Sequence, residues 1–105
     1  MTADLTPDQA LARLGELSSS VRDAVVLDAA GNLLAGSEDL GQDAAALLCA
    51  TRAAAIEVAD ERGAVYAVRS DEHAIVALAA RPALPALMFY DLRAVLAGLE
   101  DAPGP

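Results

Sequence analysis

Residues 43 to 62 form a long run that contains neither proline nor glycine and is dominated by alanine. Alanine has the highest intrinsic helix propensity, and Gly63 directly after the run is a residue that often ends a helix. The run therefore predicts one long α-helix. At about 100° per residue this helix has two apolar stripes. The first stripe comprises Ala44, Leu47, Leu48, Thr51, Ala55 and Val58, and the second comprises Ala45, Cys49, Arg52, Ala53 and Ile56.

The second stripe needs a cover, because one sheet can bury only the first. Between Asp43 and Asp60 the charged residues are Arg52 and Glu57, whereas a helix face in water normally carries more charge. We expect a second copy of the chain to cover this stripe, because small oligomers are mostly two-fold dimers. The alternatives are an exposed alanine face or a cover from elsewhere in the same chain.

The rest of the sequence carries helix, strand and turn signals. Thr6, Pro7 and Gln9 have the pattern of a capped helix N-terminus. Asp28 to Asn32 has the composition of a hairpin turn. The predicted order is α-β-β-α-β-β-β-α, with helices from Thr6, over 43–62 and from Asp91, and strands at 24–27, 33–35, 64–69, 74–80 and 86–90, the last two joined by a proline-containing connection at 81–85.

The predicted strands at 74–80 and 86–90 are apolar at successive positions, which indicates a sheet covered on both faces. Hairpin connections make that sheet mostly antiparallel. The predicted fold class is therefore α/β of the α+β type, a five-stranded sheet with helices on both faces. The length of 105 residues suits one domain, and we expect residues 1–105 to form it, with an ordered core at about 6–100 and a disordered C-terminal tail.

Composition excludes several classes of partner. The formal net charge is −9, which repels nucleic acid and anionic lipid surfaces. No apolar run approaches the length of about 20 residues that spans a bilayer, and the first residues lack the pattern of a signal peptide. Cys49 is the single cysteine, so no disulfide can form within the chain. We therefore expect a cytoplasmic protein that binds no nucleic acid and does not insert into membranes.

His73 and Cys49 are the first candidates for chemistry. His73 follows Asp71 and Glu72, and the three could form a metal site or an acid/base group, but an exposed turn with adjacent carboxylates favours a solvated histidine. Cys49 could act as a nucleophile if a histidine lay beside it. We expect a packed thiol instead, because the single histidine belongs to a distant turn.

The remaining candidates have structural explanations. Asp91 could be an active group at a strand-to-helix junction, but N-capping explains it fully, and we expect a cap. The turn at 28–32 has one glycine and no following Gly-Lys-Ser/Thr, so it predicts no phosphate-binding loop. Glu38, Asp39 and Asp43 lack the alternating spacing of a calcium loop and suit the positive end of a helix dipole. We expect no catalytic residue, no metal and no cofactor.

Two segments carry a resemblance to a known family. Val25-Val26-Leu27-Asp28-Ala29-Ala30-Gly31-Asn32-Leu33-Leu34-Ala35 and Leu87-Met88-Phe89-Tyr90-Asp91-Leu92-Arg93, with this order of elements, resemble the roadblock/dynein light chain family from Leu11 to Leu99. Longin and profilin-like domains share parts of the layout. The alanine-rich composition is similar to the bacterial branch, whose members include regulators of Ras-like GTPases.

The resemblance implies a function and an interface. It implies a homodimer in which the long helix packs on its symmetry mate and the third strand extends the sheet across the interface. It also implies that the dimer regulates or scaffolds a small Ras-like GTPase. The alternative is a ligand-sensing profilin-like or longin-like domain that binds a small molecule, against which the low aromatic content argues. The candidate interface residues are Ala45, Cys49, Arg52, Ala53 and Ile56 on the helix and Tyr66 and Val68 on the third strand.

Overall fold

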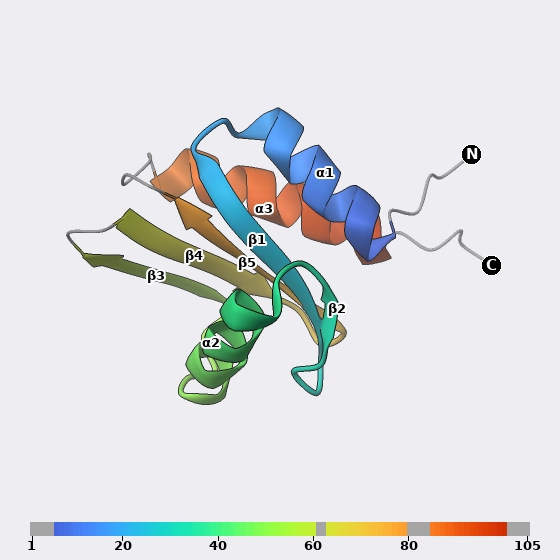
Figure 1. Cartoon of the computed structure of the whole chain (residues 1–105), viewed down its shortest axis with the longest axis vertical. Coiled ribbons are helices and arrows are strands. Elements are labelled where there is room, and N and C mark those ends of the chain that lie inside the picture. Colours follow the sequence, from blue (N-terminus) through green and yellow to red (C-terminus); the bar gives the residue numbers. More distant parts are fainter. Residues whose placement is uncertain (1–5, 61–62, 80–84, 101–105) are drawn as a thin grey trace.

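The computed structural model describes residues 6–60, 63–79 and 85–100. It confirms the predicted order of helices and strands (Figure 1). The predicted disordered tail and most of the predicted connection at 81–85 lie outside the described residues. The elements are α1 (Pro7–Leu17), β1 (Val21–Asp28), β2 (Leu33–Ala35), α2 (Glu38–Cys49), β3 (Ala55–Asp60), β4 (Gly63–Arg69), β5 (His73–Ala79) and α3 (Pro85–Glu100).

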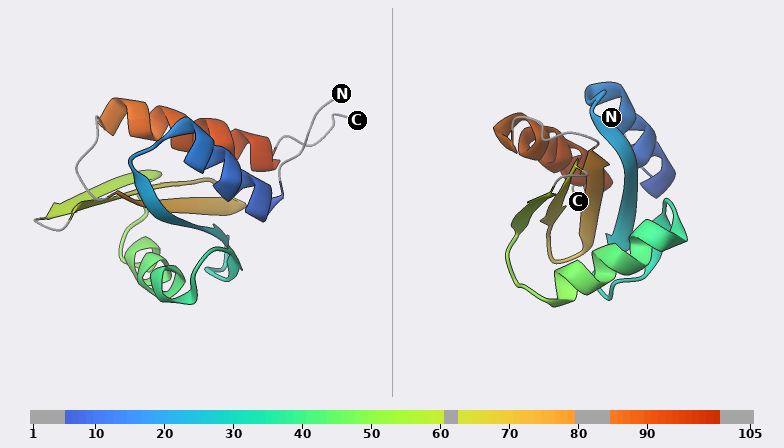
Figure 2. Two further views of the ribbon diagram at one scale, coloured as in Figure 1. Left: turned by 45° about the horizontal axis from the view of Figure 1, so that its top comes forward. Right: turned by 60° about the vertical axis from the view of Figure 1, so that its left-hand side comes forward.

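The five strands form one sheet in the order β2-β1-β5-β4-β3, and every neighbouring pair is antiparallel. Helices α1 and α3 lie side by side on one face of the sheet, and α2 lies on the other (Figure 2). The sheet is therefore covered on both faces, as predicted. Among the described residues, no helix is both long enough and apolar enough to cross a membrane.

Two apolar clusters fill the two spaces between the layers. The larger one lies under α1 and α3 and includes Tyr66, whose ring meets that of Phe89 edge-on at a centroid distance of 5.7 Å. The smaller one lies under α2 and is built from Val25, Leu27, Ala44, Leu48, Ala67, Ala74 and Val76. Because β1 and β5 contribute to both clusters, their central residues are buried at successive positions.

The local signals of the N-terminal half are confirmed. Thr6 caps α1 in a capping box with Gln9. In the hairpin turn, the Asp28 carboxylate accepts hydrogen bonds from the backbone N–H groups of Ala30 and Asn32 and from the Asn32 side-chain amide. Gly31 takes a φ of 90°, which suits glycine. These contacts are all made within a few residues, so sequence reasoning could find them.

The predicted long helix over 43–62 is wrong. Helix α2 begins at Glu38, capped by the Ser37 side chain, and ends at Cys49. Residues 55–60 form strand β3, which pairs along its whole length with β4. Ile56 and Val58 are β-branched and occupy alternate positions of this strand. Pairing with a neighbouring strand therefore overrides the helix propensity of the surrounding alanines.

The predicted strand at 86–90 and the predicted helix start at Asp91 are also wrong. Helix α3 begins at Pro85, a position that proline suits because its missing N–H would have no partner there. Asp91 lies inside the helix and does not cap it. The helical spacing becomes visible only over a longer window, in the buried residues Met88, Leu92, Val95 and Leu96.

Candidate interaction surface

Strand β3 is an edge of the sheet. It pairs with β4 on one side, and no described strand pairs with its other side. The opposite edge strand, β2, has only three residues. Val58, in the middle of β3, is 49% exposed and Ile56 is half-buried. An open edge with exposed apolar side chains is a surface on which another strand can pair.

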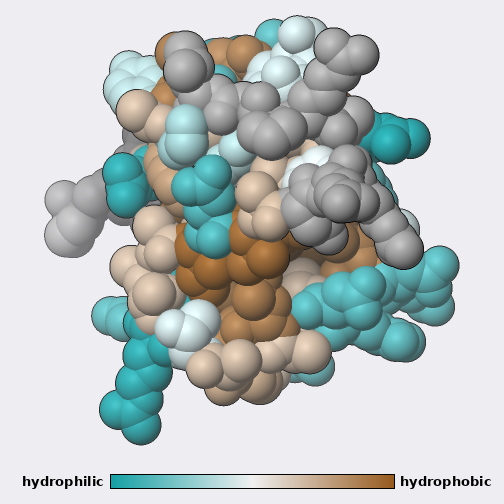
Figure 3. All heavy atoms as spheres, turned by 90° about the vertical axis from the view of Figure 1, so that its left-hand side faces the viewer, coloured by the Kyte–Doolittle hydropathy of each residue, from teal (hydrophilic) through white to brown (hydrophobic). Residues whose placement is uncertain are grey.

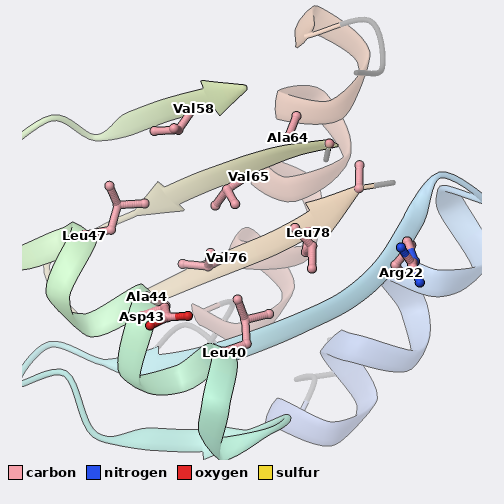
Figure 4. Close-up of a pocket in the computed structure, with 12 residues that line it drawn as sticks. Arg22, Leu40, Asp43, Ala44, Leu47, Val58, Ala64, Val65, Val76 and Leu78 are labelled. Atoms are coloured by element: carbon pink, nitrogen blue, oxygen red, sulfur yellow. The ribbon is translucent and has the colours of Figure 1, made fainter. Parts of the chain in front are cut away.

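An apolar groove continues from this edge onto the sheet. It has a volume of about 550 Å³ and lies between α2 and the open part of the sheet. Figure 4 shows Leu47 of α2, Val58 of β3 and Leu78 of β5 around it, with Arg22 at the far end. Figure 3, which faces the side of the molecule where β3 lies, shows apolar residues gathered at the centre of this face.

The groove runs alongside α2, which contributes Leu40, Ala44 and Leu47 to its lining. The helix covers Val25, Leu27 and Val76 with Ala44 and Leu48 and stops at Cys49. Beside the helix, the sheet residues that line the groove are covered by no described element on that side and include the half-buried Val65 and Leu78.

Arg69 holds the connection between α2 and β3. Its guanidinium donates hydrogen bonds to the backbone carbonyls of Leu48 (Nη1, 2.7 Å), Ala53 (Nε, 2.9 Å) and Thr51 (Nη2). Its backbone N–H donates to the Ala54 carbonyl at 3.0 Å. A cation suits this place, because the carbonyls at a helix C-terminus carry partial negative charge. The two elements that border the groove are thus tied together by one side chain.

Sequence reasoning missed Arg69, since nothing in its own segment indicates a role. Its acceptors lie 16 to 21 residues earlier in the chain. The sequence showed only that Arg69 ends an apolar strand. Many solvent-exposed arginines occupy such a position, so this did not indicate a structural role.

The structure separates the predicted interface residues. Ala45 packs against the cluster under α2. Cys49 is exposed at the last residue of that helix, so the expectation of a packed thiol is wrong. Arg52 and Ala53 are exposed in the connection after it. Ile56 lies on the open edge strand β3. These residues therefore do not form one helical stripe.

The placement predicted for Tyr66 and Val68 is wrong. Both lie on β4, which is paired on both sides, by β3 and by β5. Tyr66 is 0% exposed and Val68 is 2% exposed, under α1 and α3. They therefore belong to the core, and β3 is the strand that could extend the sheet.

The structure brings Cys49 and His73 to one hollow, where the sequence suggested that they are far apart. This hollow has a volume of about 420 Å³ and also borders Asp28, Arg52 and Asp71. In the described part of the chain, no three histidine, cysteine or acidic side chains are grouped so that they could hold a metal ion.

No protein-family model matches the sequence, and no curated protein matches it. Solved structures do match the fold. The Roadblock/LC7 domain from Streptomyces avermitilis has a TM-score of 0.72 and 21% identity, covering 85% of this chain and 93% of that one. The gliding protein MglB from Thermus thermophilus has a TM-score of 0.72 and 16% identity, covering 97% and 99%. Acanthamoeba castellanii profilin IB has a TM-score of 0.61 and 16% identity, covering 95% and 98%. The chain thus has the fold of Roadblock/LC7 domains.

Proposed function

We propose that the protein is a homodimeric interaction module of the cytoplasm that regulates or scaffolds a small Ras-like GTPase and has no catalytic residue of its own. The observation that carries the proposal is the open edge of β3, whose exposed Val58 is continuous with the apolar groove. The likeness of the fold to Roadblock/LC7 domains and MglB supports it. One solved MglB structure is described as having a tetrameric arrangement, so a protein of this fold can self-associate.

In the proposed dimer, β3 pairs antiparallel with β3 of a second copy. A strand edge is self-complementary in this arrangement, because alternate residues direct a backbone N–H donor and a C=O acceptor to the open side. The second copy would also cover the groove beside α2. Ile56, Val58 and Leu47 then form the apolar centre of the interface. Cys49, Arg52 and Ala53 remain candidates for its border.

A GTPase assay tests the proposed regulation. Ras-like GTPases from the same organism are loaded with GDP or a GTP analogue and used to capture the protein. The partner so identified should then hydrolyse or exchange nucleotide at a different rate when the protein is added. Calorimetry with GTP or GDP alone should show no binding, since Glu38 and Asp39 occupy the first turn of α2 and would repel phosphate.

Two results would change this proposal. Micromolar binding of nucleotide by the isolated protein would contradict it. Capture of a GTPase without any change in its rates would leave a scaffold rather than a regulator.

A second candidate function is the binding of a small apolar molecule in the groove, whose volume of about 550 Å³ is typical of ligand pockets. A second copy and a ligand would occupy the same space. An apolar fluorescent dye should therefore bind poorly to the dimer. Strong, saturable dye binding by the intact dimer would favour the ligand-binding function.

A further inference from the structure

The side chains of β3 alternate between the two faces of the sheet. Ile56 packs with the cluster under α2, and Val58 lines the groove on the same face. Glu57 stands opposite Tyr66 of β4, and Tyr66 belongs to the cluster on the other face. Glu57 is exposed. The edge strand thus presents apolar side chains on one face and a carboxylate on the other.

Two-fold symmetry limits how this strand can pair with a second copy. Residues directly opposite each other in an antiparallel pair point to the same face of the sheet. A residue of β3 therefore faces either itself or a residue an even number of positions away. The two-fold axis must therefore pass beside one residue of each strand, which then faces its own copy, and we call this residue the centre of the pairing. Strand β3 runs from Ala55 to Asp60. If the pairing is centred at Glu57 or at Val58, all but one of these residues lie opposite a β3 residue of the second copy. Every other centre leaves more residues unpaired.

The two centres differ in the pairs that they create. A centre at Glu57 sets Ile56 opposite Val58 twice on the groove face and Glu57 opposite itself on the other face. A centre at Val58 sets Val58 opposite itself and Ile56 opposite the charged residue Asp60 twice. Apolar cross-strand pairs stabilise a sheet, and like charges that face each other directly destabilise it. The centre at Glu57 therefore has two favourable pairs against one unfavourable pair.

We infer that the two copies pair about Glu57, so that the two Glu57 carboxylates face each other at the two-fold axis and weaken the dimer. Glu57 then lowers the affinity of the dimer, while Ile56 and Val58 set its register. This inference rests on the proposed dimer and goes beyond it. A charged residue at an open edge also limits uncontrolled pairing of strands.

Cysteine cross-linking tests the register. In a Cys49→Ser background, Glu57→Cys and Val58→Cys are compared under mild oxidation. A centre at Glu57 brings residue 57 of the two copies directly opposite each other, within reach of a disulfide. We expect Glu57→Cys to form a covalent dimer faster than Val58→Cys.

The outcomes separate the inference from the proposed dimer. Faster cross-linking of Val58→Cys would overturn the centre at Glu57 and leave the β3 dimer in place. If neither variant cross-links and the Cys49→Ser parent has the mass of a single chain, the dimer itself is contradicted, and the inference falls with it.

Affinity measurements test the role of the carboxylate. Glu57→Gln should tighten the dimer, lowering its dissociation constant by about two- to five-fold at low salt. Added salt should tighten the wild-type dimer more than this variant, because salt screens the repulsion. Glu72→Gln, in the exposed segment between β4 and β5, removes the same charge elsewhere and should change little. An unchanged or weakened Glu57→Gln dimer would overturn the inference.

Discussion

Gly36 lies between β2 and α2 in a conformation and a space that exclude any side chain. Its φ is 106°, and an added Cβ would lie 2.5 Å from the Ala24 carbonyl oxygen and 2.9 Å from the Val25 Cα. Because these neighbours include backbone atoms, they cannot move aside cheaply. We expect Gly36→Ala to lower the free energy of unfolding by more than about 1 kcal/mol, as measured by urea denaturation.

Gly15 supplies the matched control. It lies in the interior of α1, and an added Cβ would meet nothing within 4 Å. Gly15→Ala should therefore raise the free energy of unfolding by about 1 kcal/mol, through helix propensity. Equal effects of the two substitutions would contradict the argument from space and backbone conformation.

Asp28 makes the stability of the hairpin depend on pH. The hydrogen bonds that its carboxylate accepts, first from the Asn32 side chain and then from backbone N–H groups, hold its pKa below the ordinary value of 3.8. A lowered pKa in the folded state stabilises the fold above that ordinary value, and the contribution is lost as the pH falls through the lower folded pKa. The stability advantage of the wild type over Asp28→Asn should therefore shrink below about pH 4.

Thermal unfolding between pH 7 and pH 3 measures this difference. Asn32→Ala removes the main cause of the shift, so its difference from the wild type should also shrink in acid. A constant difference between wild type and Asp28→Asn across this range would contradict the assignment.

At the scale of elements, Arg69 ties the end of α2 to the start of β3 through the carbonyls of Leu48, Thr51 and Ala53. Arg69→Met removes these donors, and we expect the free energy of unfolding to fall by about 1.5–3 kcal/mol. Arg69→Lys keeps the charge but cannot reach three carbonyls at once, so it should recover only part of this loss. Hydrogen exchange should speed up at the amides of residues 50–56 in both variants.

Arg13→Met is the control for Arg69. Arg13 forms an exposed ion pair with Glu16 at 3.9 Å, and such pairs contribute about 1 kcal/mol or less. Wild-type rates of amide hydrogen exchange at residues 50–56 in Arg69→Lys would contradict the role of the guanidinium. They would show that a single positive charge is enough to hold the connection.

At the scale of the whole molecule, the proposed dimer depends on Val58. Val58→Asp places a carboxylate in the centre of the interface, while the single chain should tolerate it, because Val58 is already 49% exposed there. Light scattering at micromolar concentration should give twice 10.7 kDa for the wild type and 10.7 kDa for the variant. Ile56→Asp should have the same effect but is a less clean test, since Ile56 also packs under α2.

Leu87→Asp is the matched control for Val58→Asp. Leu87 is 54% exposed on α3, which covers the opposite face of the sheet. This variant should remain dimeric. A dimeric Val58→Asp would show that another surface joins the two copies, and a wild type with the mass of one chain would contradict the dimer.

Features whose contacts are local could be predicted from the residues alone. The cap of α1 joins Thr6 to Gln9, and the turn of the first hairpin joins Asp28 to Asn32, so the groups that make each contact stand within a few residues of one another. The sequence also indicated that both faces of the sheet are covered, because residues 74–79 are apolar at successive positions.

Long-range contacts, by contrast, determine which alanine-rich segments are strands. Residues 55–60 have no strong local preference, and the ladder to β4 makes them a strand. Residues 86–90 are helical because α3 buries Met88 and Leu92 against the sheet. The candidate surface depends on the same long-range contacts: the groove lies between α2 and strands β3, β4 and β5, and Arg69 reaches carbonyls far back in the chain. Neighbours brought together by folding, rather than the residues of each segment, therefore determine this surface.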